Sequence, residues 1–105
     1  MKLALVTGAY KGMGLEWVKQ LAQEKYTVIL AARNLDIAQK AADSLNFPAN
    51  QIIPKDLDIS SEADIIKLKN WVDENFGKID LIINNAGINP KDYADKSRMA
   101  KAFYL

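Results

Sequence analysis

A glycine-rich turn near the start of the chain is the first feature that could do chemistry. The apolar run Leu3–Val6 leads directly into residues 7–14 (TGAYKGMG), and a helical pattern follows. Glycine permits positive φ and close backbone approach, and a helix N-terminus presents N–H groups and a positive dipole end to a phosphate. The spacing of Gly8, Gly12 and Gly14 differs from the G-x-G-x-x-G fingerprint. We interpret this turn as a pyrophosphate-binding loop; the alternative is a tight turn without a ligand.

Polar residues also follow the third and fourth apolar runs of the chain. The carboxylate of Asp58 could accept a hydrogen bond from an amino group such as that of adenine; alternatively, Asp58 forms a turn or caps the next helix. Buried amides such as those of Asn84 and Asn85 can bridge loops to strands. We interpret Asn84 as mainly structural and expect Asn85, Ala86 and Gly87 to bring the backbone close to the ribose of a cofactor.

Basic residues occur near the position where an acidic residue would favour NAD as the cofactor. The NAD fingerprint places Asp or Glu near the end of the second strand, on the ribose 2′-hydroxyl, but this sequence has Arg33 there and no acid. Lys11 precedes Gly12 in the glycine loop. Two cations beside the adenosine 2′-position favour a 2′-phosphate, Arg33 through planar bidentate contact. The sequence therefore favours NADP; the alternative is two ordinary solvated charges.

Four short apolar runs must position these groups: residues 3–6, 27–31, 51–53 and 79–83. Most are apolar on both faces, which is typical of parallel strands covered by helices on each side. Between them, three helical patterns have apolar faces led by Val18, Ala41 and Leu68. The alternation predicts a doubly wound α/β fold with right-handed crossovers.

Local signals set the ends of these elements. Asn34 is a candidate N-cap, Ser61 with Asp64 resembles a capping box, and Gly77 is a natural helix stop. Pro54 lacks the N–H of a central strand, so we expect the third strand at an edge, which agrees with the order 3-2-1-4. We predict one domain over residues 1–105, with an irregular or weakly helical tail from about residue 90.

The motifs jointly resemble the short-chain dehydrogenase/reductase family from Lys2 to about Asn89. Residues 7–14 resemble its cofactor motif, residues 84–87 its N-N-A-G motif, and residues 57–59 its adenine-contacting segment. Met13 resembles the family's usual aliphatic position and is expected to anchor the loop in the core. The resemblance implies a Rossmann-like fold, a dinucleotide cofactor and a cofactor-binding set made of Gly8, Tyr10, Lys11, Gly12, Met13, Gly14, Arg33, Asp58, Ile59, Asn85, Ala86 and Gly87.

The family's catalytic pair is missing from this sequence. The family uses a Tyr with a Lys four residues later, helped by a Ser and an Asn, and a nearby ammonium lowers the pKa of such a tyrosine. None of the four tyrosines here has that lysine, and Tyr93 with Lys96 is three residues apart. By resemblance we expect a truncated cofactor-binding half of an NADP-dependent oxidoreductase, inactive alone and without catalytic residues. The alternative is a non-catalytic nucleotide-binding or interaction module, or a remnant.

The composition and charge of the chain exclude several kinds of catalytic site and binding partner. Cysteine and histidine are absent, which excludes disulfides, thiolate catalysis, His-based triads and the usual metal ligands. The 14 basic and 13 acidic residues nearly balance, so no nucleic-acid partner is expected. Only four apolar residues follow Lys2, whereas a secretory signal needs about 7–15. We expect a cytoplasmic location, no membrane association, and self-association through the exposed edge of the fourth strand.

A receiver-like or GTPase-like α/β domain is a weaker alternative. The chain has no G-x-x-x-x-G-K-[ST] loop and no carboxylate cluster at the end of the first strand.

Overall fold

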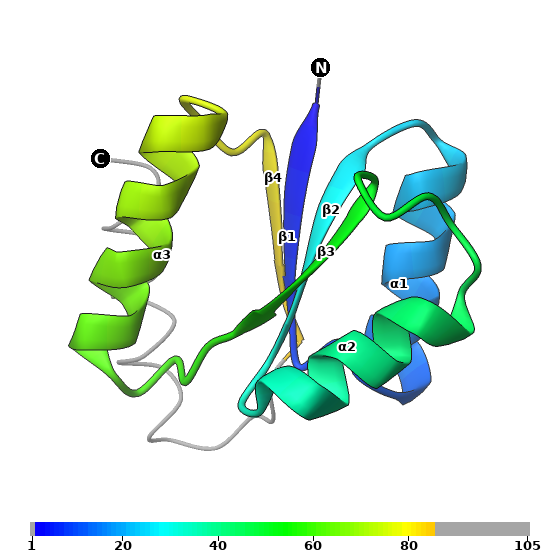
Figure 1. The fold of residues 1–105 in the computed structure, drawn as a ribbon, viewed down its shortest axis with the longest axis horizontal. Helices are drawn as coiled ribbons and strands as arrows, with labels where there is room; N and C mark the ends of the chain where they lie inside the picture. The colour runs from blue at the N-terminus through cyan, green and yellow to red at the C-terminus, as the bar shows by residue number, and fades with distance from the viewer. Residues whose placement is uncertain (1, 86–105) are drawn as a thin grey trace.

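The computed structural model describes residues 2–85, in which parallel strands and helices alternate along the chain (Figure 1). The sheet has the order β3-β2-β1-β4, and all three strand pairs are parallel. The predicted fold class and strand order are therefore confirmed. The elements are β1 (Leu3–Thr7), α1 (Gly12–Gln23), β2 (Thr27–Ala32), α2 (Leu35–Ser44), β3 (Ile52–Asp56), α3 (Glu62–Asn75) and β4 (Leu81–Asn84).

The expectations for Ala86, Gly87, Tyr93, Lys96 and the tail from about residue 90 lie outside the described residues. The prediction of a single domain over residues 1–105 therefore stays a prediction. Within residues 2–85, no helix is long and apolar enough to cross a membrane.

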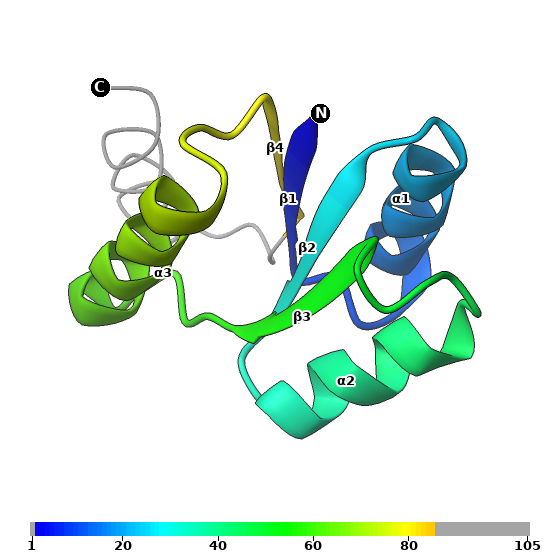
Figure 2. The same cartoon turned by 45° about the horizontal axis from the view of Figure 1, so that its top comes forward.

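Two apolar cores flank the sheet, because successive strand side chains point to opposite faces. Figure 2 shows α3 on one side of the sheet and α1 and α2 on the other. Leu5 of β1 packs in the core with Leu68 of α3, whereas its neighbour Val6 packs in the core with Val18 of α1. All five residues of β1 are buried. This arrangement explains why the strand sequences are apolar on both faces.

Side chains cap the N-terminal ends of α2 and α3. Asn34 Oδ1 accepts hydrogen bonds from the backbone N–H groups of Asp36 (2.8 Å) and Ile37 (3.3 Å), which confirms the predicted cap. Ser61 Oγ accepts from the N–H of Asp64 at 3.2 Å. The return half of the predicted capping box is absent: the Ser61 N–H donates to the carbonyl of Asp58. Asp64 is one methylene shorter than the Glu or Gln that closes such a box, and its carboxylate has a different partner.

The third strand lies at an edge, as its proline predicted, but it runs further than expected. It extends through Pro54 to Asp56 rather than ending at residue 53. The Val28 N–H donates to Gln51 O and the Leu57 N–H donates to Ala32 O. The backbone N–H and C=O groups of the odd-numbered residues in this stretch therefore point toward β2. The nitrogen of Pro54 faces away from the sheet, and its missing donor removes no ladder hydrogen bond.

A local hydrogen bond ends α3, whereas contacts with β1 fix the start of β4. Gly77 has a φ of 89° and its N–H donates to the Val72 carbonyl, which confirms the predicted helix stop. β4 begins at Leu81, two residues later than expected, although Ile79 is buried in the core beneath α3. Before it, Asp80 is fixed at both its backbone and its side chain: its N–H donates to Leu3 O, and its Oδ2 accepts from the Leu3 N–H.

Candidate functional site

The glycine loop joins the carboxyl end of β1 to α1. Gly8 and Gly12 both have a φ of 59°, the left-handed region that favours glycine. Between them Ala9 is fully buried, and its N–H donates to Ala31 O of β2 at 3.1 Å. A Cβ added at Gly12 would meet no atom within 4 Å. The loop is therefore anchored at Ala9 and open at Gly12, where a ligand could approach the backbone.

Gly14 is needed for close packing rather than for its backbone angles. A Cβ built there would lie 2.5 Å from Gly8 O and 2.6 Å from Asn85 Nδ2. Real Cβ atoms do not approach other atoms so closely, so even alanine would force the loop or Asn85 to move. The third glycine lets α1 begin directly against the loop and the end of β4.

A hydrogen-bond network ties β1, β4 and the loop together. The Thr7 hydroxyl donates to Asn84 Oδ1 at 2.7 Å and accepts from the Asn85 N–H at 3.1 Å. Asn85 Nδ2 donates to Gly8 O at 3.3 Å. These contacts agree with the interpretation of Asn84 as structural. The Asn85 side chain bridges the end of β4 to the loop, as expected of a buried amide at a strand end. Sequence reasoning missed the Thr7 hydroxyl, which contacts both asparagines.

The N-terminal end of α1 begins with a lysine and has no side-chain cap. Lys11 is the N-cap residue but its side chain caps no N–H, and the first turn carries no acidic residue. The Lys11 ammonium instead lies 5.4 Å from the centroid of the Tyr10 ring. By contrast, α2 and α3 have side-chain caps and acids in their first turns. Of the three helices in residues 2–85, α1 is thus the one whose N-terminal end suits an anion.

The expectation that Met13 anchors the loop in the core is wrong. Its side chain is 69% exposed. The buried face of α1 consists of Gly14, Val18 and Ala22, four residues apart, and Met13 is rotated off that face by one helical position. The Met13 side chain therefore lies outside the core and does not anchor the loop.

The end of β2 and the loop after β3 lie close together. The Leu57 N–H donates to Ala32 O at 2.7 Å, next to the exposed Arg33. Asp58 Oδ1 accepts from the Ser60 hydroxyl (2.6 Å) and N–H (2.9 Å). These hydrogen bonds, assisted by the charge of Arg33, lower the pKa of Asp58. Asp58 thus forms a turn with Ser60. The same hydrogen bonds and the nearby Arg33 guanidinium favour the ionised form of its carboxyl group.

Only the backbone of Ile59 is available to the candidate cofactor site, because its side chain is buried. Its side chain is 5% exposed and packs in the core beneath α3. A cofactor contact at this position would therefore involve backbone groups, while the neighbouring Asp58 carries the polar side chain. Because Ala86 and Gly87 lie outside the described residues, the residues brought to this edge come from four places: the glycine loop, the end of β2, the loop after β3, and Asn85 directly after β4.

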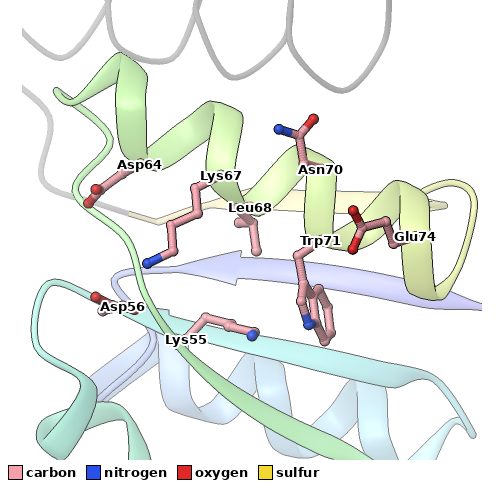
Figure 3. A pocket seen from close by; sticks show the side chains of 8 residues that line it. All are labelled: Lys55, Asp56, Asp64, Lys67, Leu68, Asn70, Trp71 and Glu74. Carbon is pink, nitrogen blue, oxygen red and sulfur yellow. The ribbon is translucent and has the colours of Figure 1, made fainter.

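A separate cavity of about 270 Å³ opens between β3 and α3 (Figure 3). Leu68 and Trp71 supply apolar surface, and the Lys55 ammonium lies 4.0 Å from the centroid of the Trp71 ring. Burial lowers the pKa of Lys55 and Lys67 acts in the same direction, whereas Asp56 raises it; the ring face also favours the ammonium. None of the residues lining this cavity belongs to the predicted cofactor-binding set. Within residues 2–85, no cluster of His, Cys, Asp or Glu could hold a metal ion.

Strand order, crossovers and the glycine loop after β1 define a Rossmann-like α/β protein. Residues 2–103 match the family model described as short chain dehydrogenase. The chain belongs to the short-chain dehydrogenase/reductase family, and its relatives include reductases and dehydrogenases.

Two curated relatives and one solved structure illustrate the match. The chain is 38% identical over 92 residues to (-)-isopiperitenone reductase of Mentha piperita, covering 84% of this chain and 29% of that protein. It is 40% identical over 88 residues to NADPH-dependent 1-acyldihydroxyacetone phosphate reductase of Saccharomyces cerevisiae, covering 82% and 29%. Menthone neomenthol reductase from Mentha piperita superposes with a TM-score of 0.78 at 30% identity, covering 95% and 40%. The chain thus spans well under half the length of each.

Proposed function

We propose that this chain is the NADP-binding part of a short-chain dehydrogenase/reductase that transfers hydride between NADP(H) and a carbonyl or alcohol substrate. The observation that carries the proposal is the arrangement of Arg33 beyond β2 and Lys11 at the start of α1, with no acid at the end of β2. Support also comes from the NADPH-dependent relative. The bound dinucleotide would supply the hydride, and the residues described above would hold it.

The residues present fit such a cofactor. Gly12 leaves its backbone open, and the uncapped first turn of α1 suits the pyrophosphate. Arg33 would bind the 2′-phosphate through planar bidentate contact and Lys11 through its point charge. Asp58 and the backbone of Ile59 would face the adenine, and Asn85, Ala86 and Gly87 the ribose. Tyr10 and Met13, both exposed, would flank the bound cofactor.

Equilibrium titration of the chain with NADPH and NADH tests this proposal. We expect NADPH to bind more tightly, and Arg33→Ala to lose about 1.5–3 kcal/mol of NADPH binding because a charge-assisted contact is removed. NADH affinity should change little. Lys40→Ala, which removes an exposed lysine from α2, is the matched control. Equal affinities for both cofactors, or an unchanged preference in Arg33→Ala, would reject the assignment.

A second candidate is a nucleotide-binding or interaction module without catalysis. It is favoured by the lack of a lysine four residues after any tyrosine of this sequence. The two candidates differ on mixing: addition in trans of the remaining part of a related reductase should restore hydride transfer only if this chain retains its place in an enzyme.

A further inference from the structure

Asp64 occupies the third position of α3 and makes two contacts of different kinds. Its backbone N–H donates to the N-cap hydroxyl of Ser61 at 3.2 Å, as an ordinary helix start requires. Its carboxylate Oδ2 accepts from the backbone N–H of Asp58 at 3.0 Å, six residues earlier. The second contact is not needed to cap the helix. It joins α3 to the loop after β3.

This contact fixes the loop from the side opposite to the sheet. On the sheet side, the Leu57 N–H donates to Ala32 O of β2. On the helix side, Asp64 holds the next N–H, that of Asp58. Figure 3 shows the Asp64 side chain turned toward the loop that follows β3 and away from the Trp71 end of the cavity. Two successive backbone N–H groups are therefore held in opposite directions, which sets the direction in which the Asp58 side chain leaves the backbone.

We propose that Asp64 is a positioning residue for the adenosine end of the dinucleotide site, acting through Asp58 and Ile59. This inference rests on the function proposed above, because it assumes that this segment contacts adenine. Asp64 itself would touch no part of the cofactor. A charged acceptor forms a stronger hydrogen bond than a neutral one, so the carboxylate holds the segment in one geometry before the cofactor arrives and lowers the ordering cost of binding.

The first test compares three variants by calorimetric titration with adenosine 2′,5′-bisphosphate and with reduced nicotinamide mononucleotide. Asp64→Ala should bind the adenosine probe at least about fivefold more weakly because the Asp58 N–H loses its acceptor. Asp64→Asn keeps an acceptor oxygen and should restore most of the affinity. Ser61→Ala weakens the helix start but leaves the Asp64 carboxylate in place, so it should bind the probe as the natural chain does. Binding of the nicotinamide probe should be the same in all.

Two results would overturn the proposal. One is adenosine binding in Asp64→Ala equal to that of the natural chain. The other is an equal loss in Ser61→Ala, because that would reduce the effect of Asp64 to helix stability.

The second test needs no cofactor and separates this proposal from the function on which it rests. Amide hydrogen exchange should show the Asp58 N–H protected in the natural chain and in Ser61→Ala, and exposed in Asp64→Ala. If the natural chain bound neither probe, the proposed function would fail, while the exchange data would still show whether Asp64 fixes the segment. Unchanged protection in Asp64→Ala would reject the positioning role, whatever the chain binds.

Discussion

The side-chain amide of Asn85 donates to the carbonyl oxygen of Gly8 across 3.3 Å, joining residues that are 77 positions apart in the sequence. The end of β4 thereby holds the first turn of the glycine loop. Together with the Thr7 hydroxyl, which bonds Asn84 and Asn85, this contact makes the loop part of the sheet rather than an independent turn. The geometry of the glycine loop therefore depends on residues from both ends of the described chain.

Gly14→Ala should displace the glycine loop. The added Cβ would overlap Gly8 O and Asn85 Nδ2, and overpacking of this kind costs about 1–3 kcal/mol of unfolding free energy. Gly12→Ala is the matched control, because its Cβ would meet open space and its cost of about 1–2 kcal/mol would come from backbone strain alone. The NMR signals of the Asn85 side-chain amide should shift in Gly14→Ala and not in Gly12→Ala. A shift in neither variant would contradict the predicted overlap.

Thr7→Val should destabilise the fold through lost hydrogen bonds at nearly constant volume. Thr7 is 2% exposed, so removal of its hydroxyl leaves Asn84 Oδ1 and the Asn85 N–H without this partner. We expect a loss of about 1–3 kcal/mol in the free energy of unfolding. Thr7→Ser keeps the hydroxyl and should retain more of the stability than Thr7→Val does in denaturant titrations. The reverse order would show that the methyl group matters more than the network.

Acid should weaken the link between the starts of β1 and β4. The Leu3 N–H donates to Asp80 Oδ2 at 2.8 Å, and this hydrogen bond, with help from Lys78, lowers the pKa of Asp80 below its ordinary value of 3.8. Folding therefore favours the ionised carboxyl: its contribution to stability is complete above pH 3.8 and is lost as pH falls through the lowered value. Asp80→Asn should flatten this part of the pH dependence of unfolding, whereas the exposed α2 substitution Asp43→Asn should leave it largely intact. Parallel curves for the natural chain and Asp80→Asn would refute the linkage.

The 105-residue chain alone should transfer no hydride at a measurable rate. General acid catalysis contributes about 10²–10⁴-fold, and the sequence has neither His nor Cys, nor a Tyr with a Lys four residues later. NADPH absorbance followed with a panel of aldehydes, ketones and quinones should fall no faster than the uncatalysed background. Turnover that Tyr93→Phe abolishes would show that Tyr93 and Lys96 form a working pair despite their spacing.

The outer edge of β4 should support self-association. Within residues 2–85, β4 pairs with β1 alone, and Leu81, Ile82 and Ile83 are half-buried. Because the Asp80 N–H faces β1, the N–H of Ile83 faces outward. Sedimentation should show an apparent mass that rises with concentration, and Ile83→Pro, which removes an outward donor, should reduce the rise. A monomer at all concentrations would contradict this prediction.

Much of the fold could be predicted because the local sequence signals agree with the elements that form. Two-sided apolar runs indicated buried parallel strands, and Asn34, Ser61 and Gly77 marked helix ends that the structure confirms. The bounds of β3 and β4 were less accurate. Strand ends depend on hydrogen bonds with a neighbouring strand, such as that from Leu57 to Ala32 O, which no local pattern contains.

The parts of the candidate site that require glycine or a charged residue could be predicted from the sequence. The parts that depend on how side chains pack or pair could not. The glycine loop and the position of Arg33 directly after β2 followed from the order of glycines, charges and apolar runs in the sequence. The charge of Arg33 near Asp58 is a finding of the structure. Met13 was placed wrongly because its resemblance to the family's usual aliphatic position suggested burial, whereas the helical register of Gly14, Val18 and Ala22 decides which face of α1 is covered. The Asp64 contact with Asp58 was missed because the capping pattern assigned the Asp64 carboxylate a partner at Ser61.

The position of β1 in the middle of the sheet has a consequence for the order of events during synthesis. β1 leaves the ribosome before the other described strands, yet its pairing with β4 closes the longest loop of the described sheet, and such non-local pairings form slowly. A nascent chain could assemble β1, β2 and β3 with α1 and α2 while one side of β1 still lacks its neighbour. The glycine loop would then gain its final form only after residue 85 has emerged. Competence to hold a phosphate would be acquired late, although the residues proposed to contact it lie in the loop that directly follows β1.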